Sequence, residues 1–380
     1  MSKLQKRGYI VNTAVLVVLF ALFMLLSGAL GGTDSFKLIL VPSIWQCCYL
    51  IILAASLNLV LGFLGQLSLG HCGFMAIGAY TAALLSLAFQ RAGAYDEKSG
   101  AVFIAIIFLC IIVAGLLAAV IGAVVSIPAL RLKGDYLAII TLGFGLIIVN
   151  VINNLPFAGQ NGLAEGSASA SLYATGLGFG TAAKVTYIWV ALLVTIVCIV
   201  LMFMFIRSKY GRAIRAIRND EIAASAAGIN TSHYKVLTFS FSAFFAGVAG
   251  ALYACANASL STSSFSFTNG GILNSTFVVV MVVLGGMGSL TGSIFSAVIM
   301  YVLNYQIKNG AWVSALPGFL QGVFTYPMLV YALVLVVIII FRPKGIFGSY
   351  EFSLTGLCSS LAAKLRGSKK PAAKEAVQHE

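Results

Sequence analysis

The sequence predicts an all-α polytopic membrane protein, with about ten transmembrane helices and a cytoplasmic loop that folds as two short helices. Hydrophobic residues make up 60% of the 380-residue chain and charged residues only 9%, whereas a soluble domain carries roughly 25% charged residues. The mean hydropathy is +1.02. Apolar runs long enough to cross a bilayer recur along the chain, and each run of about 18 residues or more is a candidate membrane helix.

The predicted spans are helices, because a chain that crosses lipid must satisfy its own backbone hydrogen bonds. The runs lie at 9–30, 38–62, 66–90, 101–127, 135–155, 184–206, 235–257, 271–288, 290–308 and 323–341. The first run follows three basic residues, as a signal peptide would, and residues 27–29 (Ser-Gly-Ala) resemble a cleavage site. It is longer than the about 7–15 apolar residues of a signal peptide, so we interpret it as a retained anchor.

The basic residues predict the orientation of the chain. With the N-terminus inside and the spans alternating, 18 of the 23 Lys and Arg residues fall on the cytoplasmic side, as the positive-inside rule requires. Both termini are then cytoplasmic. Topology accounts for the net charge of +13, so the charge does not indicate a nucleic-acid partner.

The chain is predicted to form one transmembrane domain, 1–349, followed by a basic cytoplasmic tail, 350–380, that we expect to be disordered. The tail lysines are interpreted as solvated, and contact with anionic lipid is the alternative. Segment 156–183 is rich in Gly, Ser and Ala and is placed outside the membrane.

Nothing in the sequence indicates an enzyme, a metal site or a bound cofactor. The seven cysteines form no C-x-x-C pair, and the three histidines form no H-E-x-x-H motif. No phosphate-binding G-x-x-x-x-G-K-[ST] loop is present. No acidic residue lies deep in a predicted span, which argues against proton or sodium coupling, although backbone carbonyls can also bind sodium. The energy for any transport must come from another polypeptide or from a solute gradient.

The loop 207–235 is an island of charge between two apolar runs and is predicted to receive a soluble partner. Its first helix is expected to start at Gly211, and Asn219 or Asp220 to cap the second, which ends at Gly228 in the C′ position. Small side chains on the second helix would let a partner approach its backbone. The alternative is a charged hairpin that only fixes topology. The predicted coupling residues are Arg212, Arg215, Arg218, Asp220, Glu221, Ala223, Ala224, Ala227 and Gly228.

Uncharged polar residues enter the spans and are candidates for a solute path. The alternative for each is an interhelical hydrogen bond, worth roughly 0.6 kcal/mol, and for a histidine a buried, satisfied donor. The candidates are Asn58, Gln66, Ser68, His71, Asn150 and Asn154.

Glycines predict close helix packing along the seventh span and at two turns. Gly247 and Gly250 lie on ridges of small residues, which let helices approach closely. Because this span directly follows the charged loop, replacing Gly247 or Gly250 by leucine is predicted to uncouple transport while leaving membrane insertion intact. Residues 61–70 and 284–292, the latter with Gly285 and Gly288, have similar glycine-interrupted sequences. They are interpreted either as an internal repeat of a transporter or as two turns of similar chemistry.

The string Ala216–Ala224 followed by Ala227–Asn230 resembles the EAA-type coupling loop of ABC importer permeases, specifically branched-chain amino acid permeases of the LivM type. Further segments resemble the same family in the same order along nearly the whole chain. These segments are Leu57–Gly62, Gly134–Gly143, Ala246–Leu252, Val283–Ser289 and Phe341–Gly345.

The resemblance implies a bacterial inner-membrane importer with four kinds of partner. These are a second permease of the LivH type, two cytoplasmic ATPases that bind ATP, an extracellular or periplasmic solute-binding protein and the lipid bilayer. Residues 158–162 read AGQNG, where family members often carry a TGGPNG-like run. A permease for urea or short amides, or a stand-alone carrier or channel, is therefore the alternative.

Overall fold

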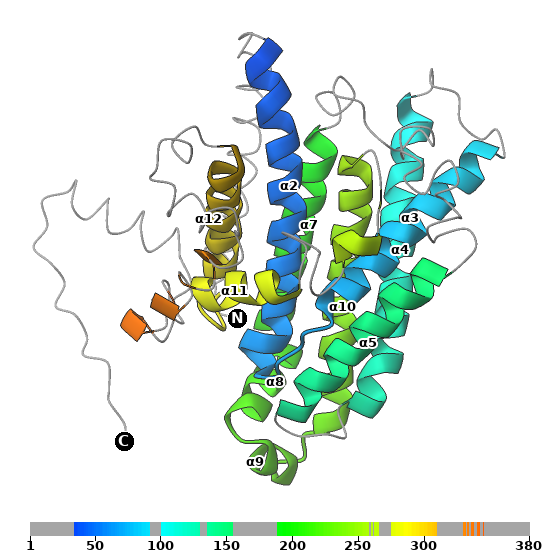
Figure 1. Ribbon diagram of the computed structural model, residues 1–380. Coiled ribbons are helices and arrows are strands. Elements are labelled where there is room, and N and C mark those ends of the chain that lie inside the picture. Colours follow the sequence, from blue (N-terminus) through cyan, green and yellow to red (C-terminus); the bar gives the residue numbers. More distant parts are fainter. Residues whose placement is uncertain are drawn as a thin grey trace, which may run out of the picture. The chain divides into compact units, whose positions relative to one another are not determined.

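The computed structural model describes residues 34–91, 100–129, 135–154, 188–257, 260, 262–265 and 275–309, together with scattered positions between 330 and 345. Helices are the only regular secondary structure in this described part (Figure 1). The predicted span at 9–30, segment 156–183 and the tail 350–380 lie outside it. So does most of the predicted span at 323–341, although its described positions are helical.

Six of the described helices are long and apolar enough to cross a bilayer, which confirms a polytopic, all-helical membrane protein. They are α2 (Asp34–Asn58), α3 (His71–Arg91), α4 (Gly100–Ala129), α5 (Asp135–Asn154), α7 (Ile188–Arg207) and α10 (Thr231–Ala256). Two shorter apolar helices follow, α11 (Ser275–Gly285) and α12 (Leu290–Asn309). Between α7 and α10 lie the two short helices of the charged loop, α8 (Lys209–Asn219) and α9 (Glu221–Ala226), and a 3₁₀ turn covers Thr262–Phe265.

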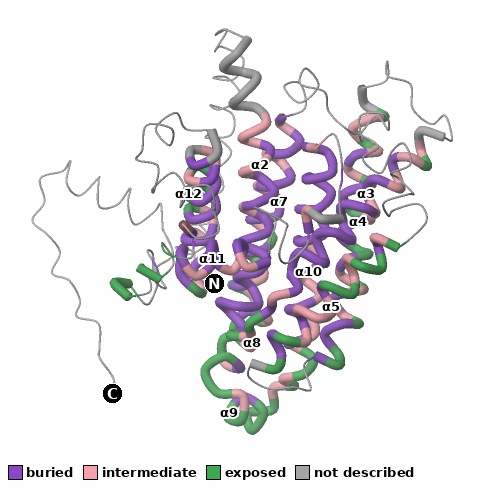
Figure 2. The backbone as a smooth tube through the Cα atoms, in the orientation of Figure 1, coloured by how far each residue is buried: buried purple, intermediate pink, exposed green. Residues whose placement is uncertain are grey.

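Helices α2 and α10 form the centre of the bundle. The apolar window of α2 and its continuation is 89% buried and that of α10 is 72% buried, against 33% for α4 and 28% for α5. Helix α10 packs against α2, α3 and α4, while α7, α11 and α12 pack against α2. In Figure 2 the buried backbone accordingly follows α2 and α10, and exposed positions gather on α5 and around α9.

Glycines allow α10 to touch the backbones of α3 and α4. A Cβ at Gly250 would lie 2.0 Å from the carbonyl oxygen of Met75, and a Cβ at Gly247 would lie 2.8 Å from that of Ala114. Small residues at membrane helix crossings permit this approach. The predicted packing role of these two glycines therefore fits the observed geometry.

Helix α2 continues after Asn58 as a π-helix, Leu59–Leu64, that ends at Gly65 with φ +77°. Residues 66–70 are not helical, and α3 starts at His71. The predicted span 66–90 therefore begins five residues too early. The link is held instead by a hydrogen bond from the Leu69 backbone N to Thr141 Oγ1 of α5, at 3.1 Å.

Helix α11 is shorter than the span predicted for 271–288. Its 11 residues measure about 16 Å, roughly half of the ~30 Å hydrocarbon core. It ends at Gly285, where a Cβ would lie 2.4 Å from the Gly292 carbonyl oxygen of α12. The two helices thus form a tight hairpin, which hydropathy cannot distinguish from a longer span.

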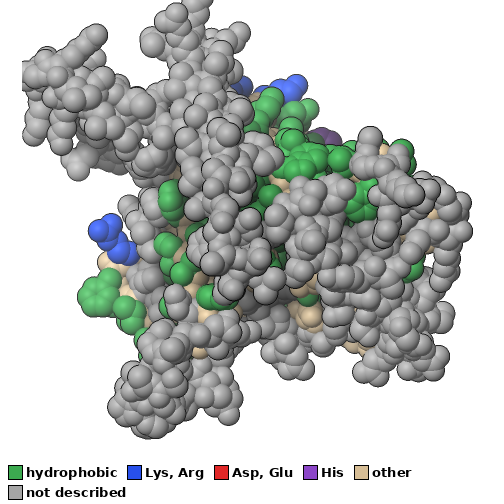
Figure 3. Space-filling model, turned by 90° about the horizontal axis from the view of Figure 1, so that it is seen from above, with side chains coloured by type: hydrophobic (Ala, Val, Ile, Leu, Met, Phe, Trp, Pro, Cys, Tyr) green, Lys and Arg blue, Asp and Glu red, His purple; other side chains and the backbone are tan. Residues whose placement is uncertain are grey.

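Large apolar side chains are exposed along the outer faces of the bundle, as lipid contact requires. On α4 they include Val120 and Val124, each 62% exposed. In the view from above, the described side chains that are visible are mainly hydrophobic (Figure 3).

Candidate functional site

Helix α8 is amphipathic and is anchored to the bundle by its apolar side. Ile214 and Ile217 are buried, whereas Arg212 is exposed. The helix starts at Lys209, two residues before the predicted Gly211, because the Ser208 hydroxyl caps it by accepting from the Tyr210 backbone N at 3.2 Å. Gly211 serves the tight turn after α7, since a Cβ there would lie 1.9 Å from the Ile206 carbonyl oxygen.

Helix α9 has only six residues and is fixed by caps at both ends. The Asp220 carboxylate accepts from the backbone N of Ile222 at 2.8 Å and of Ala223 at 3.0 Å. At the other end Gly228 has φ +82°, and the backbone N of Ile229 donates to the Ala224 carbonyl at 3.1 Å. These bonds are those of an Asp N-cap and a Schellman C-cap. The two predicted caps are confirmed.

The exposed side of α9 carries small residues around one large apolar side chain. Ala223 and Ala227 are exposed, and Ile222 is 81% exposed. Ala224, predicted to face a partner, is only 4% exposed. Ala224 lies on the face of α9 that packs against the rest of the chain.

An ion pair joins α9 to α10. The Lys235 Nζ lies 2.6 Å from Glu221 Oε1, and the lysine side chain is only 8% exposed while the glutamate is 42% exposed. A buried ammonium needs such a partner, because an unpaired charge is expensive to bury. The Glu221 carboxylate is therefore engaged within the chain, in the first turns of the helix that leads to the bundle centre.

Two of the three predicted coupling arginines also bond within the chain. Arg215 Nη2 donates to the Ile206 carbonyl at 2.9 Å. Arg218 Nη1 donates to the carbonyl of Gly62, in the π-helix that continues α2. For the Arg212 side chain, which is exposed, the described part of the chain shows no hydrogen bond or ion pair.

The two glycine turns singled out in the sequence meet at Asn58. This side chain is fully buried, and its Nδ2 donates to the Ser289 carbonyl at 2.8 Å and to Ser293 Oγ at 2.7 Å. Its Oδ1 accepts from the Gly288 backbone N at 3.0 Å. Asn58 thus clamps the end of α2 to the α11–α12 turn. These three hydrogen bonds are of the interhelical kind that was the alternative to a place in the solute path.

His71 is also bonded inside the bundle. It is 2% exposed, and its Nε2 lies 2.7 Å from the Ser56 hydroxyl. Ser242 of α10 donates to the Ser56 carbonyl at 2.6 Å. His71 therefore takes part in the contact of α2, α3 and α10, as the alternative to a solute ligand predicted.

The remaining path candidates lie in two separate places. Gln66 Oε1 and Ser68 Oγ are buried in the link before α3 and have no hydrogen-bond partner in the described part of the chain. Asn150 and Asn154 are exposed on α5, where Asn154 Nδ2 donates to the Asn150 carbonyl at 2.8 Å. The six predicted path residues therefore do not form one site.

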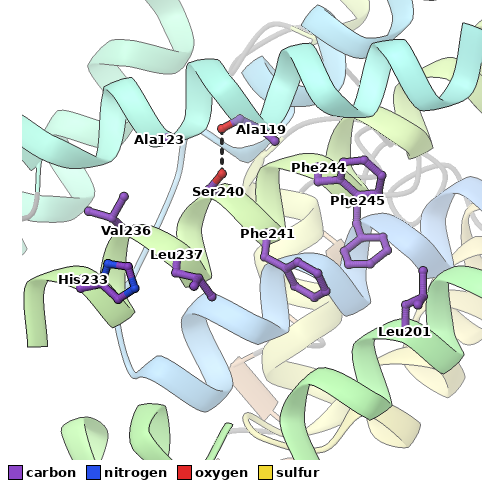
Figure 4. A pocket seen from close by; sticks show the side chains of 10 residues that line it. All are labelled: Ala119, Ala123, Leu201, His233, Val236, Leu237, Ser240, Phe241, Phe244 and Phe245. Carbon is purple, nitrogen blue, oxygen red and sulfur yellow. Dashed lines mark hydrogen bonds between the residues drawn. The ribbon is translucent and has the colours of Figure 1, made fainter. Parts of the chain in front are cut away.

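A groove of about 580 Å³ lies between α4, α7 and α10, and Figure 4 shows its side chains. Its lining is mostly apolar, with three phenylalanines of α10 along it and His233 at one end. The hydroxyl of Ser240 points into the wall and donates to the Ala119 carbonyl at 2.9 Å. A zwitterionic solute would find few polar partners in this groove.

Sequence reasoning missed three residues that contact predicted ones. Gly62 and Lys235 join α8–α9 to the bundle, and Ser293 of α12 bonds to Asn58. Gly62 lies in the glycine-interrupted segment 61–70, and Lys235 is the last residue of the charged loop 207–235, so both carried a signal. Ser293 carried none, because its partner is set by the tertiary structure.

A bundle of long apolar helices with buried polar groups bonded inside it, and a capped polar element at one end, defines a multi-pass membrane protein of the transport permease class. The family model for the branched-chain amino acid transport system / permease component matches residues 39–341, and the chain belongs to this family. It is a transport permease and not an enzyme. The resemblance that the motifs predicted is confirmed.

Known relatives support this assignment. The chain is 34% identical to the high-affinity branched-chain amino acid transport system permease protein LivM of Escherichia coli (strain K12), over 78% of this chain and 67% of the relative. It is 25% identical to LivH of the same strain, over 79% of this chain and 91% of the relative. The fructose import permease protein FrcC of Rhizobium meliloti is 28% identical over 48% of this chain and 52% of its own length. No solved structure matches the chain.

Proposed function

We propose that this chain is the LivM-type membrane subunit of an ABC importer for branched-chain amino acids, and that α8 and α9 receive the force of a cytoplasmic ATPase. One observation carries the proposal. The exposed α8–α9 element is bonded to both central helices, through Arg218 to the π-helix that continues α2 and through Glu221 to α10. A surface loop that only fixed topology would not need these connections.

The remaining subunits follow from this assignment. A LivH-type permease would complete the membrane part, two ATPases would bind ATP on the cytoplasmic side, and a solute-binding protein would deliver cargo outside. The chain itself would cross the bacterial inner membrane about ten times, with both termini in the cytoplasm, as the distribution of basic residues predicts. Three exposed residues are further proposed coupling residues, in addition to those that bond to the bundle. They are Arg212, Ala223 and Ala227.

The solute is proposed from the relatives. LivM and LivH are named for branched-chain amino acids, but FrcC, named for fructose, matches about half of this chain. The LivM match is higher in identity and covers more of the chain than the FrcC match, which favours branched-chain amino acids over sugars.

The path for the solute is proposed at the outer face of α5, against the second permease. Asn150 and Asn154 are exposed there, and a polar side chain facing lipid is costly. Gly143 of the same helix has no atom within 4 Å of a Cβ built on it. A face with exposed amides suits a pathway between two subunits better than contact with acyl chains.

The proposal is tested with the complete complex in liposomes. We expect ATP-dependent uptake of radiolabelled leucine that unlabelled isoleucine and valine inhibit and fructose and urea do not. Ala223→Arg should abolish ATPase binding and uptake, while Ala223→Ser, which adds little bulk, should preserve both. Uphill uptake by this chain without ATPase subunits would refute the proposal, as would full transport by Ala223→Arg.

A further inference from the structure

We infer that Arg218 is the positioning residue through which movement of α8 and α9 reaches the membrane helices, because it joins the two glycine turns of the chain. The inference rests on the proposed function and adds the route of the force. The two turns are residues 62–65 at the end of α2 and residues 285–288 at the end of α11. They come from opposite halves of the sequence, yet one side chain from α8 contacts both.

The first contact is with a carbonyl that the backbone leaves unpaired. A helix ends with several carbonyls that lack an intrahelical partner. The backbone N groups of Gly65 and Gln66 both donate to the Val60 carbonyl, so they do not pair with Gly62. The guanidinium of Arg218 donates to the Gly62 carbonyl. Arg218 therefore completes the C-terminal end of the helix that lies at the centre of the bundle.

The second contact depends on the absence of side chains. The Arg218 Cγ lies 3.0 Å from where a Cβ of Gly65 would be, and Nη1 lies 3.0 Å from where a Cβ of Gly288 would be. Both glycines have positive φ, +77° and +93°. The aliphatic part of the Arg218 side chain thus occupies the space beside Gly65, and its guanidinium occupies the space beside Gly288.

The two turns are also fixed to each other, so a displacement of one must move the other. A Cβ at Gly62 would lie 2.3 Å from the Gly288 backbone N, and the Asn58 Oδ1 accepts from that same N. A pull on Gly62 through Arg218 therefore acts on α2 and on the α11–α12 hairpin together. The Arg215 side chain bonds elsewhere, to the Ile206 carbonyl at the end of α7.

The experiment uses the complete complex in liposomes, with Arg218→Ala, Arg218→Lys and, as the matched control, Lys209→Ala. Lys209 is exposed at the start of α8, so the control removes the same charge from the same helix. For Arg218→Ala we expect an assembled complex that still hydrolyses ATP, while the amount of solute moved per ATP falls about tenfold or more, as for the loss of a charged hydrogen bond. Arg218→Lys should recover part of the solute moved per ATP, because an ammonium can still donate to one carbonyl. Lys209→Ala should stay within about twofold of wild type.

The ratio of transport to hydrolysis separates positioning from mere stability, because a destabilised complex loses both together. If Arg218→Ala does not assemble, Arg218→Gln, which keeps most of the stem without the reach, replaces it. An unchanged ratio in the Arg218 variants would overturn the inference, as would an equal loss in Lys209→Ala. The proposed function fails by a different result, namely a wild-type complex that does not import branched-chain amino acids with ATP.

Discussion

Replacing Gly250 by alanine should weaken the bundle at its centre. A Cβ at this position would lie 2.0 Å from the Met75 carbonyl oxygen and 2.8 Å from the Ala79 backbone N. Carbon and oxygen atoms in contact are about 3.3 Å apart or more, so α10 and α3 would have to separate by about 1.3 Å. Both obstructing atoms belong to the backbone of a helix and cannot rotate away. Overpacking of this kind costs about 1–3 kcal/mol, occasionally more.

The matched control is Gly143→Ala on α5, where no atom lies within 4 Å of the added methyl group. Alanine is favoured over glycine in a helix by about 0.8–1 kcal/mol, so this variant should be at least as stable as wild type. Because both variants gain the alanine preference, the expected difference between them is the overpacking cost, about 1–3 kcal/mol. The assay is thermal unfolding of the detergent-solubilised chain, followed by the exposure of its buried cysteines to a thiol dye. Equal unfolding midpoints for the two variants would refute the reasoning.

The same geometry changes the expectation for leucine at Gly247 or Gly250. Leucine was predicted to uncouple transport without affecting insertion. A leucine side chain at either position would meet the backbone of α3 or α4 at under 3 Å from its first atom. The variant would therefore test the packing of the bundle before it tested coupling, and Arg218 gives the cleaner test.

Three further variants test the junctions around α8 and α9. Asn58→Leu leaves the Gly288 backbone N unpaired in a buried place and should lower stability by about 1–3 kcal/mol; an unchanged melting temperature would contradict this. Asp220→Ala removes both N-cap bonds of α9 at about 1 kcal/mol and should speed amide exchange in α9 severalfold, measured by mass spectrometry; unchanged exchange would rule the capping role out. A double-mutant cycle of Glu221→Gln and Lys235→Met should give a coupling of at most about 1 kcal/mol in thermal unfolding, because the glutamate is 42% exposed; a value above about 2 kcal/mol would show that the pair is better shielded than its exposure indicates.

Structural features that depend only on residues close together in the chain could be predicted from the sequence. Hydropathy located α2, α4, α5, α7 and α10 to within a few residues, because a membrane helix must be apolar along its length whatever it packs against. The caps of α9 were also predictable. An Asp followed by a short alanine-rich stretch and a Gly satisfies its terminal backbone groups locally, with no contribution from the rest of the chain.

Contacts between distant residues could not be predicted in the same way. Asn58 was selected as a polar residue in a span, but its partners Ser289 and Ser293 are 231 and 235 residues away. The hydrogen-bonding capacity of an amide does not reveal whether a solute or another helix fills it. Likewise Ala224 and Ala223 are adjacent and chemically identical, and only the packing of α9 decides that one is buried and the other exposed.

The distribution of satisfied polar groups bears on where a solute can pass. Inside the bundle, Asn58 and His71 are bonded to neighbouring helices, and Ser296 of α12 donates to the Met281 carbonyl of α11. A hydrophilic passage through these contacts would have to break them, and each buried group left unpaired costs about 1–3 kcal/mol. At the outer face of α5, by contrast, the amides of Asn150 and Asn154 are exposed, and a solute there need displace no interhelical bond. This difference in free energy is why we place the path between two permease subunits and assign the interior of this chain to transmitting force.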